Sequence, residues 1–451
     1  MDTQVAESQL DDELPTDLPE EVEEGWQYRE PVWCPWITAT GENLRQVVDE
    51  IVHQTLNAER FLPRFKRKRA RRAADLETFR ATVASLVAHV AHEYLREAGG
   101  IRVSLESAVL RRASRYRSPL QGTMLPRILD LLSCPEMSFL NVVKGSRGFG
   151  PNGGRQTSIT AGPRLVSRLV SHRVTSEDIQ RAPGEEIVML KGTKDDSSGR
   201  SALVDYADSE LADRYRTDVR QLNEWLDGAD ITYTGTDKRG DDRDRFLRRY
   251  FTRGDWFSGG RLFGGFWQRL RKADRLANVE IDGRPVVSLD FRAMLPSLAY
   301  AYVGQPVPAG DLYAVTFTDT EGSPRVLPRE TVKKILSAAL NGAKEWPREL
   351  RELRSGLPWS SVLQALREHH PAIAHMFGAD FGQSLTFTES TILLDVLFTL
   401  KDAEVVALPV HDCIVVADAH AQLAEQAMLD AFKTHCHQDA RVAIERAKEI
   451  A

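Results

Sequence analysis

Runs of apolar residues divide the C-terminal half of the chain into strands and turns. Val286–Leu289 is an apolar run interrupted by a single serine, and it predicts a buried strand that ends on Asp290. Val405–Val410 and Ile414–Val416 are two further apolar runs, and they predict a strand, a turn and a second strand. Asp412 lies at the turn between them. Both aspartates therefore sit at strand ends in apolar surroundings, where a carboxylate is costly unless it is hydrogen-bonded or bound to metal.

A helical periodicity covers Arg329–Ala343, and an amphipathic helix is also predicted at Ala421–Cys436. Arg329 and Lys333 are four residues apart and project from one face of the first predicted helix. Asn341 and Gly342 lie about two turns beyond Lys333, and this small end of the helix would let a base pair dock at the substrate site. One interpretation is that the two cations bind phosphate oxygens. The alternative is a helix with its cations in solvent and its apolar residues in the core.

Helical patterns also dominate the region from residue 28 to residue 180. The predicted elements there are helices within Gly41–Ala98 and at Leu125–Leu132 and Pro163–Val170, and a strand at Gln156–Thr160. The last three resemble the outline of a winged helix, with the glycine-rich Gly145–Gly154 as its wing. The aromatic, proline-rich stretch Tyr28–Trp36 is expected to pack on this region as an extended arm.

The chain is thus predicted to have four segments. Residues 1–27 form an acidic disordered tail, and residues 28–180 a helical N-terminal region with a winged-helix-like module. Residues 181–250 form a linker or thumb-like region, and residues 251–451 carry both aspartates and the cationic helix.

Charge is unevenly distributed along the chain. The net charge of the 451 residues is −6, but residues 1–25 hold ten of the 65 acidic residues and neither Lys nor Arg, so the rest is mildly basic.

No apolar run approaches the roughly 18 residues that a membrane span requires. The four cysteines include no CxxC pair, which argues for a reducing compartment and against a disulfide framework or a structural zinc site. We therefore expect a cytoplasmic protein without a membrane partner.

Two stretches have compositions suited to nucleic acid. Arg64–Arg72 carries seven cations in nine residues, either to neutralise phosphates or as a solvated surface paired with acids elsewhere. Phe251–Leu270 combines aromatic residues, glycines and arginines, which suit stacking and phosphate contact. A core segment with turns is the alternative there. Arg261, between Gly260 and Leu262, is the candidate nucleic-acid-binding residue.

Asp290 and Asp412 are the candidate metal ligands. Two carboxylates at strand ends, distant in sequence, commonly hold two divalent ions for phosphoryl transfer. Mg²⁺ binds through a few carboxylates together with substrate phosphates, so two aspartates suffice. Either aspartate alone could be a surface residue at a bend. The cationic helix that carries Arg329 and Lys333 favours the metal interpretation, because it supplies a partner for a triphosphate.

In sequence order, these features resemble motifs A, B and C of family A DNA polymerases and the related single-subunit phage RNA polymerases. The matching residues are Asp290, then Arg329-x3-Lys333-x7-Asn341-Gly342, then Val410-His411-Asp412, and Gly260-Arg261-Leu262 resembles a segment that precedes motif A in that family. The chain is also similar to polymerase-like proteins of phages and mobile elements. The resemblance covers residues 251–451 and implies an α+β right-hand fold, with an antiparallel palm sheet and helical fingers.

By this resemblance, Asp290 and Asp412 would bind two Mg²⁺ ions, with Mn²⁺ as the other candidate. Arg329 and Lys333 would bind the incoming nucleoside triphosphate, and Lys333 would also protonate pyrophosphate. His411 would contact the primer end. Arg261 would contact the template or primer strand. The implied function is a template-directed DNA polymerase without proofreading, in DNA replication.

Two positions depart from the family pattern. Asn341 replaces a tyrosine that stacks on the nucleotide, and Leu295 replaces a glutamate of motif A. Both positions govern sugar choice, so a primase or RNA polymerase that uses ribonucleotides is an alternative. A non-catalytic DNA-binding replication or regulatory protein, acting through the N-terminal region, is a second alternative. The sequence does not indicate an oligomeric state.

Overall fold

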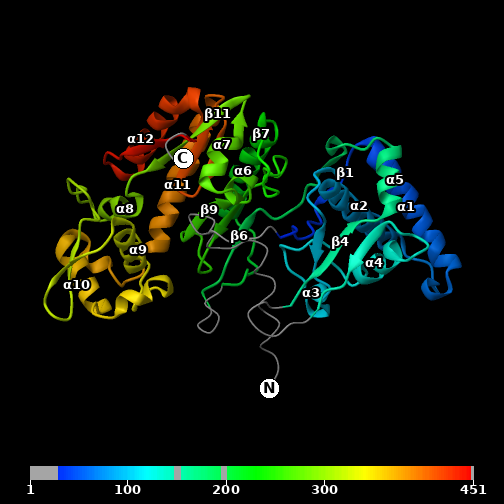
Figure 1. Cartoon of the computed structure of the whole chain (residues 1–451), viewed down its shortest axis with the longest axis horizontal. Coiled ribbons are helices and arrows are strands. Elements are labelled where there is room, and N and C mark those ends of the chain that lie inside the picture. Colours follow the sequence, from blue (N-terminus) through cyan, green and yellow to red (C-terminus); the bar gives the residue numbers. More distant parts are fainter. Residues whose placement is uncertain (1–28, 147–153, 195–200, 448–451) are drawn as a thin grey trace, which may run out of the picture. The chain divides into compact units, whose positions relative to one another are not determined.

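The computed structural model describes residues 29–146, 154–194 and 201–447 (Figure 1). These residues form two compact units that divide between Glu186 and Ile187. We call them the N-terminal and C-terminal units. The predicted tail at 1–27 and most of the predicted wing at Gly145–Gly154 lie outside the described residues. Within the described ranges, no helix has the length and apolar character needed to cross a membrane.

Two long helices and a small antiparallel sheet form the N-terminal unit. Its helices are α1 (Glu42–Phe61), α2 (Ala73–Leu95), α3 (Ser107–Arg111), α4 (Leu125–Ser133) and α5 (Pro163–Ser171). Its strands are β2 (Ile101–Val103), β4 (Thr157–Ala161) and β3 (Leu140–Val143), paired in that order, and β1 (Ile37–Ala39), which pairs with β5 (Ile179–Arg181). The predicted short helices are thus confirmed as α4 and α5, whereas the winged-helix arrangement stays a prediction.

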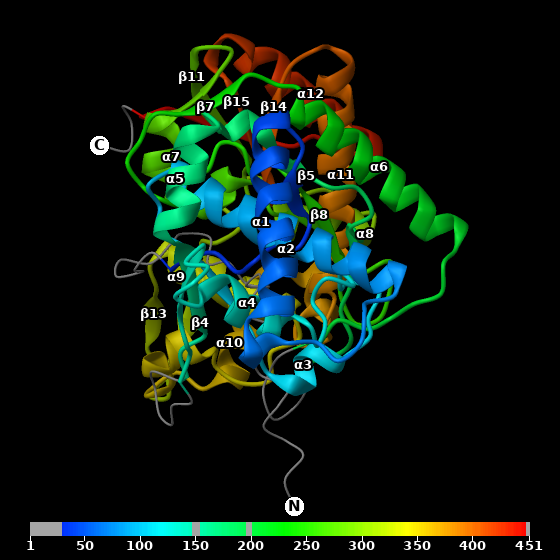
Figure 2. The same ribbon diagram turned by 90° about the vertical axis from the view of Figure 1, so that its right-hand side faces the viewer.

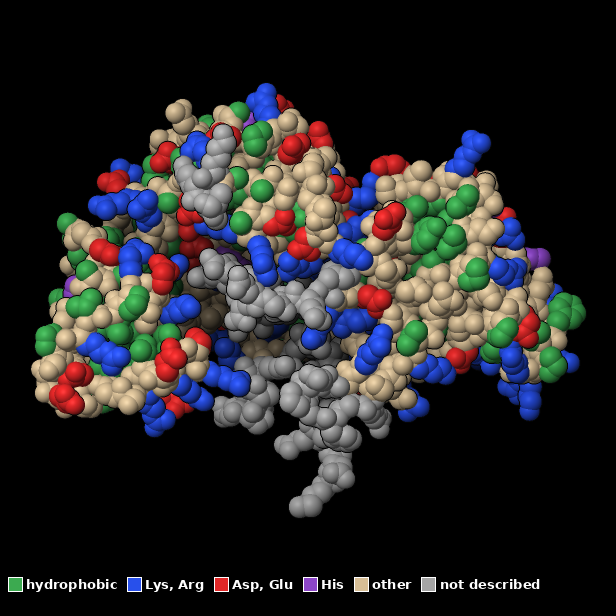
Figure 3. Space-filling view, viewed as in Figure 1, with side chains coloured by type: hydrophobic (Ala, Val, Ile, Leu, Met, Phe, Trp, Pro, Cys, Tyr) green, Lys and Arg blue, Asp and Glu red, His purple; other side chains and the backbone are tan. Residues whose placement is uncertain are grey.

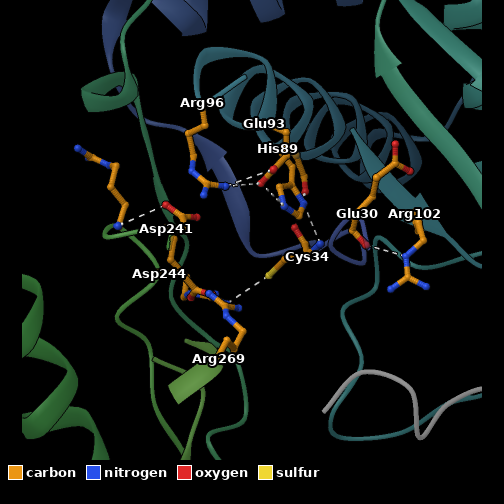
Figure 4. A network of polar contacts seen from close by, with 12 residues as sticks. Glu30, Cys34, His89, Glu93, Arg96, Arg102, Asp241, Asp244 and Arg269 are labelled. Carbon is orange, nitrogen blue, oxygen red and sulfur yellow. Dashed lines mark hydrogen bonds and ion pairs between the residues drawn. The ribbon is translucent and has the colours of Figure 1, made fainter. Parts of the chain in front are cut away.

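Partly buried polar contacts hold the segment before α1 against the N-terminal unit (Figure 4). The backbone N–H of Cys34 donates to Nδ1 of His89 at 3.0 Å. Nε of Arg102 donates to the carbonyl oxygen of Glu30 at 2.6 Å. Trp33 is only 2% exposed. The predicted N-terminal arm therefore packs on this unit from residue 29 onward.

A six-stranded antiparallel sheet lies at the centre of the C-terminal unit. Its strands are β14 (Ala407–Val410), β15 (Cys413–Ala417), β11 (Arg284–Phe291), β10 (Val279–Ile281), β7 (Ile231–Tyr233) and β16 (Val442–Glu445). The longest strand, β11, pairs with β15 along one edge and with β10 and then β16 along the other. The strand predicted before Asp290 and the hairpin predicted around Asp412 are both confirmed.

The two faces of β11 differ in chemistry because successive side chains point to opposite faces. Leu289 and Phe291 are buried on one face, where the ring of Phe291 lies 5.7 Å from that of Phe432. Phe432 belongs to α12 (Ala421–Cys436), which packs beside α11 (Gly382–Asp402) (Figures 1 and 2). Ser288 and Asp290 point to the other face.

A second sheet packs on the side of α11. It contains β6 (Val188–Leu190), β8 (Arg248–Phe251) and β9 (Gly259–Phe263), with β6 parallel to β8. The largest buried cation of this region is Arg249, which is 2% exposed. Its Nε donates to the carbonyl oxygen of Gly260 at 2.9 Å, and its guanidinium lies over the rings of Tyr215 and Phe251. Burial lowers the pKa of Arg249 to about 10, so it remains charged at neutral pH.

Helices complete the C-terminal unit. They are α6 (Glu210–Asp227), α7 (Lys272–Asn278), α8 (Met294–Tyr302), α9 (Arg329–Leu340) and α10 (Trp359–His369), and a hairpin of β12 (Thr316–Thr318) and β13 (Pro324–Val326) lies between α8 and α9. The apolar side of α6, with Val219, Leu222 and Leu226, joins the core that also holds β11. The predicted combination of helices with antiparallel sheets is confirmed.

We expect Gly260→Ala to destabilise the C-terminal unit. Gly260 has φ of +85°, and a Cβ there would lie 2.7 Å from Oγ of Ser390 on α11. A left-handed alanine costs about 1–2 kcal/mol, and overpacking against a helix adds about 1–3 kcal/mol. Denaturant unfolding of the full chain measures the decrease in the free energy of unfolding.

Gly283→Ala is the matched control for this substitution. Gly283 also has positive φ, +65°, but a Cβ added there would have no atom within 4 Å. The Gly283→Ala substitution should lower the free energy of unfolding only by the cost of a left-handed alanine, without the overpacking. Equal losses in the two variants would contradict the importance of the contact between β9 and α11.

Candidate active site

Strand pairing brings the two candidate metal ligands together. Asp290 lies directly opposite Cys413 in the β11–β15 pair, and Asp412 is the residue just before Cys413, at the bend after β14. Cα atoms of opposite residues in antiparallel strands are about 4.5–5.5 Å apart. Beneath them, the Cys413 thiol contacts Oγ of Ser288 at 2.8 Å. Two aspartates far apart in sequence thus lie at one point of the sheet.

The Asp290 carboxyl group lacks a hydrogen-bond donor at one oxygen among the described residues and lies near other acidic groups. Its Oδ1 atom is buried and has no hydrogen-bond partner among the residues that the structure describes. Burial, followed by the charges of Asp412 and Glu445, raises the pKa of Asp290 to about 8, while Lys272 and Lys333 act in the opposite direction. A buried oxygen without a donor, beside a second carboxylate, is suited to a cation.

A lysine and a glutamate join the two aspartates that the sequence indicated. Lys272, the first residue of α7, forms an ion pair with Glu445. Glu445 ends β16 directly opposite Ser288, so its side chain shares the face of Asp290. Sequence reasoning missed both residues because neither lies in a motif. The short alternation at Val442–Glu445 was the available signal for the strand, but not for its partner.

Lys333 and Arg329 have different surroundings on α9. The charge of Lys333 lowers the pKa of Asp290, so this lysine lies within electrostatic reach of that carboxylate. Nε of Arg329 is 3.0 Å from Oδ2 of Asp311, and its guanidinium lies over the ring of Tyr313 at 4.7 Å. Of the two cations predicted to bind a triphosphate, one therefore acts electrostatically on Asp290, and the other contacts the segment before β12.

The end of α9 is held by contacts to the start of α11. Asn341 follows the last residue of α9, and its Oδ1 accepts a hydrogen bond from Nε2 of Gln383 at 3.4 Å. Gly342 has φ of +79°, and a Cβ there would lie 2.6 Å from Cβ of Asp380. Leu295, at the start of α8, is half-buried against the core. These three predicted substrate-binding positions therefore have structural contacts of their own.

His411 is a half-buried, neutral side chain next to Asp412. Its backbone is left-handed, with φ of 57°, and its ring packs edge-on against Phe263 at 5.5 Å. Burial lowers the pKa of His411 to about 3, and the charges of Arg261 and Arg275 act in the same direction. The Nδ1 atom is buried and has no hydrogen-bond partner within the described ranges. The imidazole is therefore uncharged at neutral pH.

Arg261 is oriented by a buried acid. Its Nε donates to Oε1 of Glu389 at 2.6 Å, and Glu389, on α11, is 2% exposed. The Arg261 side chain is itself about one third exposed, at 32%. A charge-assisted bond of this kind fixes the plane of the guanidinium. Glu389 is a further residue that sequence reasoning missed, because its partner is more than a hundred residues away.

Comparisons with known proteins find structural similarity only at a low level. No protein-family model matches the chain, and no curated protein matches it either. Among solved structures, the chain is similar to the POL domain of Pol1 from M. smegmatis in complex with DNA primer-template and dNTP, with 11% identity and a TM-score of 0.27. The similarity covers 90% of this chain and 66% of that chain, which is less than two thirds of its length. At this level of similarity, we base the function on the site geometry.

The raised pKa of Asp290 predicts how metal binding depends on pH. The folded protein keeps a proton on Asp290 up to about pH 8, whereas the ordinary pKa is 3.8. The folded state therefore binds more protons than the unfolded state in this window, and the free energy of unfolding should fall as the pH rises from about 4 to about 8. A cation that binds the ionised carboxylate should reverse this loss.

We therefore expect Mg²⁺ to raise the Tm by several degrees at pH 8.5 and by less at pH 6, since 1 kcal/mol corresponds to about 2–4 °C. Asp290→Asn removes the titration and should abolish the response to Mg²⁺, while raising the Tm of the metal-free protein at pH 8.5. Thermal melts of both proteins at the two pH values check this. A full Mg²⁺ response in Asp290→Asn would contradict the assignment of Asp290 as a ligand.

Proposed function

We propose that the C-terminal unit is a template-directed nucleotidyltransferase, a DNA polymerase of the family A type without proofreading. The observation that carries the proposal is the meeting of Asp290 and Asp412 at one end of the β11–β15 pair, within electrostatic reach of Lys333. In this proposal the six-stranded sheet, backed by α11 and α12, is the palm. The helices α8, α9 and α10 form the fingers.

The residues at the sheet bend fit a pair of divalent cations. Asp290 offers an oxygen that is buried and without a donor among the described residues, and Asp412 offers a second carboxylate next to it. Carboxylate oxygens are the ligands that Mg²⁺ and Mn²⁺ prefer. When bound, such ions lower the pKa of the attacking hydroxyl and stabilise the charge on the leaving pyrophosphate. Asp290 and Asp412 would hold two of them.

The cations of α9 would bind the incoming nucleotide. The charge of Lys333 reaches Asp290, and its ammonium would contact phosphate oxygens and donate a proton to pyrophosphate. Arg329, at the start of the same helix, would exchange its contact with Asp311 for the triphosphate. The helix N-terminus adds a favourable dipole for an anion.

Two residues on the rim would position the nucleic acid. The neutral His411 would contact the primer end by hydrogen bonding, and the oriented guanidinium of Arg261 would contact the template or primer strand. Asn341 and Leu295 replace the side chains that select the sugar in the family. Primer extension with deoxynucleotides and with ribonucleotides, with and without a primer, therefore separates a DNA polymerase from a primase or RNA polymerase.

Asp290→Asn and Asp412→Asn should each lower the rate of primer extension by at least about a thousandfold, because each removes a ligand of the metal pair. Binding of primer-template, measured by fluorescence anisotropy, should change little. Asp282→Asn, an exposed substitution at the turn that precedes β11, is the control and should be as active as the wild type. If the wild-type protein extends no primer with either nucleotide set, the non-catalytic DNA-binding alternative replaces this proposal.

Lys333→Ala should raise the KM for the nucleotide by about tenfold or more, since it removes a charge-assisted contact to the triphosphate. Lys334→Ala is the matched control, because Lys334 is the next residue of α9 and is exposed, whereas Lys333 is half-buried. Steady-state kinetics with varied nucleotide concentration measure both variants. Equal KM values in Lys333→Ala and in the wild type would remove α9 from the nucleotide site.

A further inference from the structure

The N-terminal unit carries a loop of exposed cations between α1 and α2. Two arginines of the cationic run Arg64–Arg72 are fixed by ion pairs. Arg71 pairs with Glu59, which is 3% exposed, and its guanidinium lies 3.9 Å from the centre of the Phe79 ring. Arg64 pairs with Glu136. These two contacts anchor both ends of the run to the helical core.

The remaining cations of the run point to solvent. They are Lys66, Arg67, Lys68, Arg69 and Arg72, which we call the basic loop. All five are exposed, and within residues 29–146, 154–194 and 201–447 none of them forms an ion pair. The interpretation that the run is neutralised by acids elsewhere therefore holds for Arg64 and Arg71 but not for these five residues.

Backbone contacts keep the basic loop folded despite its charge. The backbone N–H of Arg67 donates to the carbonyl oxygen of Glu59 at 3.3 Å, which brings the loop back to the last turn of α1. Nη2 of Arg127 donates to the carbonyl oxygen of Phe65. Like charges at this density repel one another, so the folded loop is favoured only because it is anchored. An anion would relieve this repulsion.

An exposed aromatic ring lies at the same end of α1. Phe61 is the last residue of the helix and is 78% exposed. In Figure 3, Lys and Arg side chains and exposed hydrophobic ones gather at the right-hand tip, where Figure 1 shows the connection between α1 and α2. Cations along a backbone together with a ring on which a base can stack are the features that bind single strands.

We infer that the basic loop and Phe61 form a binding site for the sugar-phosphate backbone and bases of single-stranded nucleic acid. The site lies wholly within the N-terminal unit, so it does not depend on catalysis by the C-terminal unit. An anionic lipid surface would also attract the cations. Membrane-surface segments, however, insert an extended apolar helix face, and the exposed apolar group here is a single ring.

The test is fluorescence anisotropy of the full chain with a labelled oligonucleotide of about 20 nucleotides, as DNA and as RNA, at several salt concentrations. The fourfold variant Lys66→Ala, Arg67→Ala, Lys68→Ala and Arg69→Ala should raise the Kd at least tenfold at low salt. It should also reduce the slope of log K against log salt by about 2–3, since each phosphate contact to a single strand contributes about 0.7. If only the DNA or only the RNA oligonucleotide binds, that result identifies the nucleic acid that the site recognises.

Three controls separate charge, stacking and folding. Arg45→Ala removes an exposed arginine near the other end of α1, about 24 Å from Phe61 at 1.5 Å per residue, and should leave the Kd unchanged. Arg67→Lys with Arg69→Lys keeps the charge and should keep the salt slope. Phe61→Ala should weaken binding to the single strand more than binding to duplex DNA. Circular dichroism melts should show that all variants fold.

An unchanged Kd and salt slope in the fourfold variant would overturn the inference. The inference would also be overturned if the fourfold variant no longer bound phosphatidylserine vesicles but still bound oligonucleotides. The loop would then be a lipid-binding site. The wild-type protein could fail to extend a primer and still bind oligonucleotides through the loop. That result would count against the proposed polymerase function but not against this binding site.

Discussion

A carboxylate oxygen that is buried without a hydrogen-bond donor raises the free energy of the folded chain unless a charge compensates it. The C-terminal unit is arranged around such an atom, Oδ1 of Asp290, which has no donor among the described residues. Asp290 lies in the longest strand of the central sheet, where β15 and β16 flank it on either side. β16 brings Glu445 to the same face, and the turn before β15 brings Asp412 close to Asp290, so acidic groups gather at this point of the sheet. Lys272 and Lys333 offset part of that charge from two different helices. The pairing of β11 therefore fixes the chemistry of the whole face.

The helix α11 connects this sheet to the second sheet of the unit. One part of it packs against β9, where Gly259 and Gly260 adopt left-handed conformations and allow close approach. The same stretch of helix supplies Glu389 to Arg261, and Ser390, whose hydroxyl donates to the carbonyl oxygen of Gly259 at 3.1 Å. Farther along, α11 packs beside α12. One element thus sets the position of the arginine relative to the carboxylates.

Local patterns in the sequence predicted much of this fold. The apolar runs around Asp290 and Asp412 correspond to β11 and the β14–β15 hairpin, and the predicted helices at Arg329–Ala343 and Ala421–Cys436 correspond to α9 and α12. These predictions were correct because each depends on the spacing of residues within one strand, hairpin or helix. The helical pattern of the N-terminal region was readable for the same reason.

The contacts that complete the site could not be read from the sequence. The pairing of β16 with β11, which places Glu445 beside Asp290, depends on which strand lies next to which, and a four-residue strand carries no such information. The buried partner of Arg261 and the contact of Arg329 with Asp311 are likewise set by packing between elements. Charge patterns indicate which side chains need a partner, but not which partner they find.

The ion pair of Arg261 and Glu389 has a consequence for the order in which a strand would be recognised. Because the acid offsets the charge of the guanidinium at its own position, the pair adds little to the long-range attraction that the protein exerts on a polyanion. Its hydrogen-bond donors act only over a few ångströms and in a fixed direction. In the proposed polymerase, such a group would distinguish well-placed strands from misplaced ones after arrival, and added salt would weaken this discrimination less than it weakens the initial encounter.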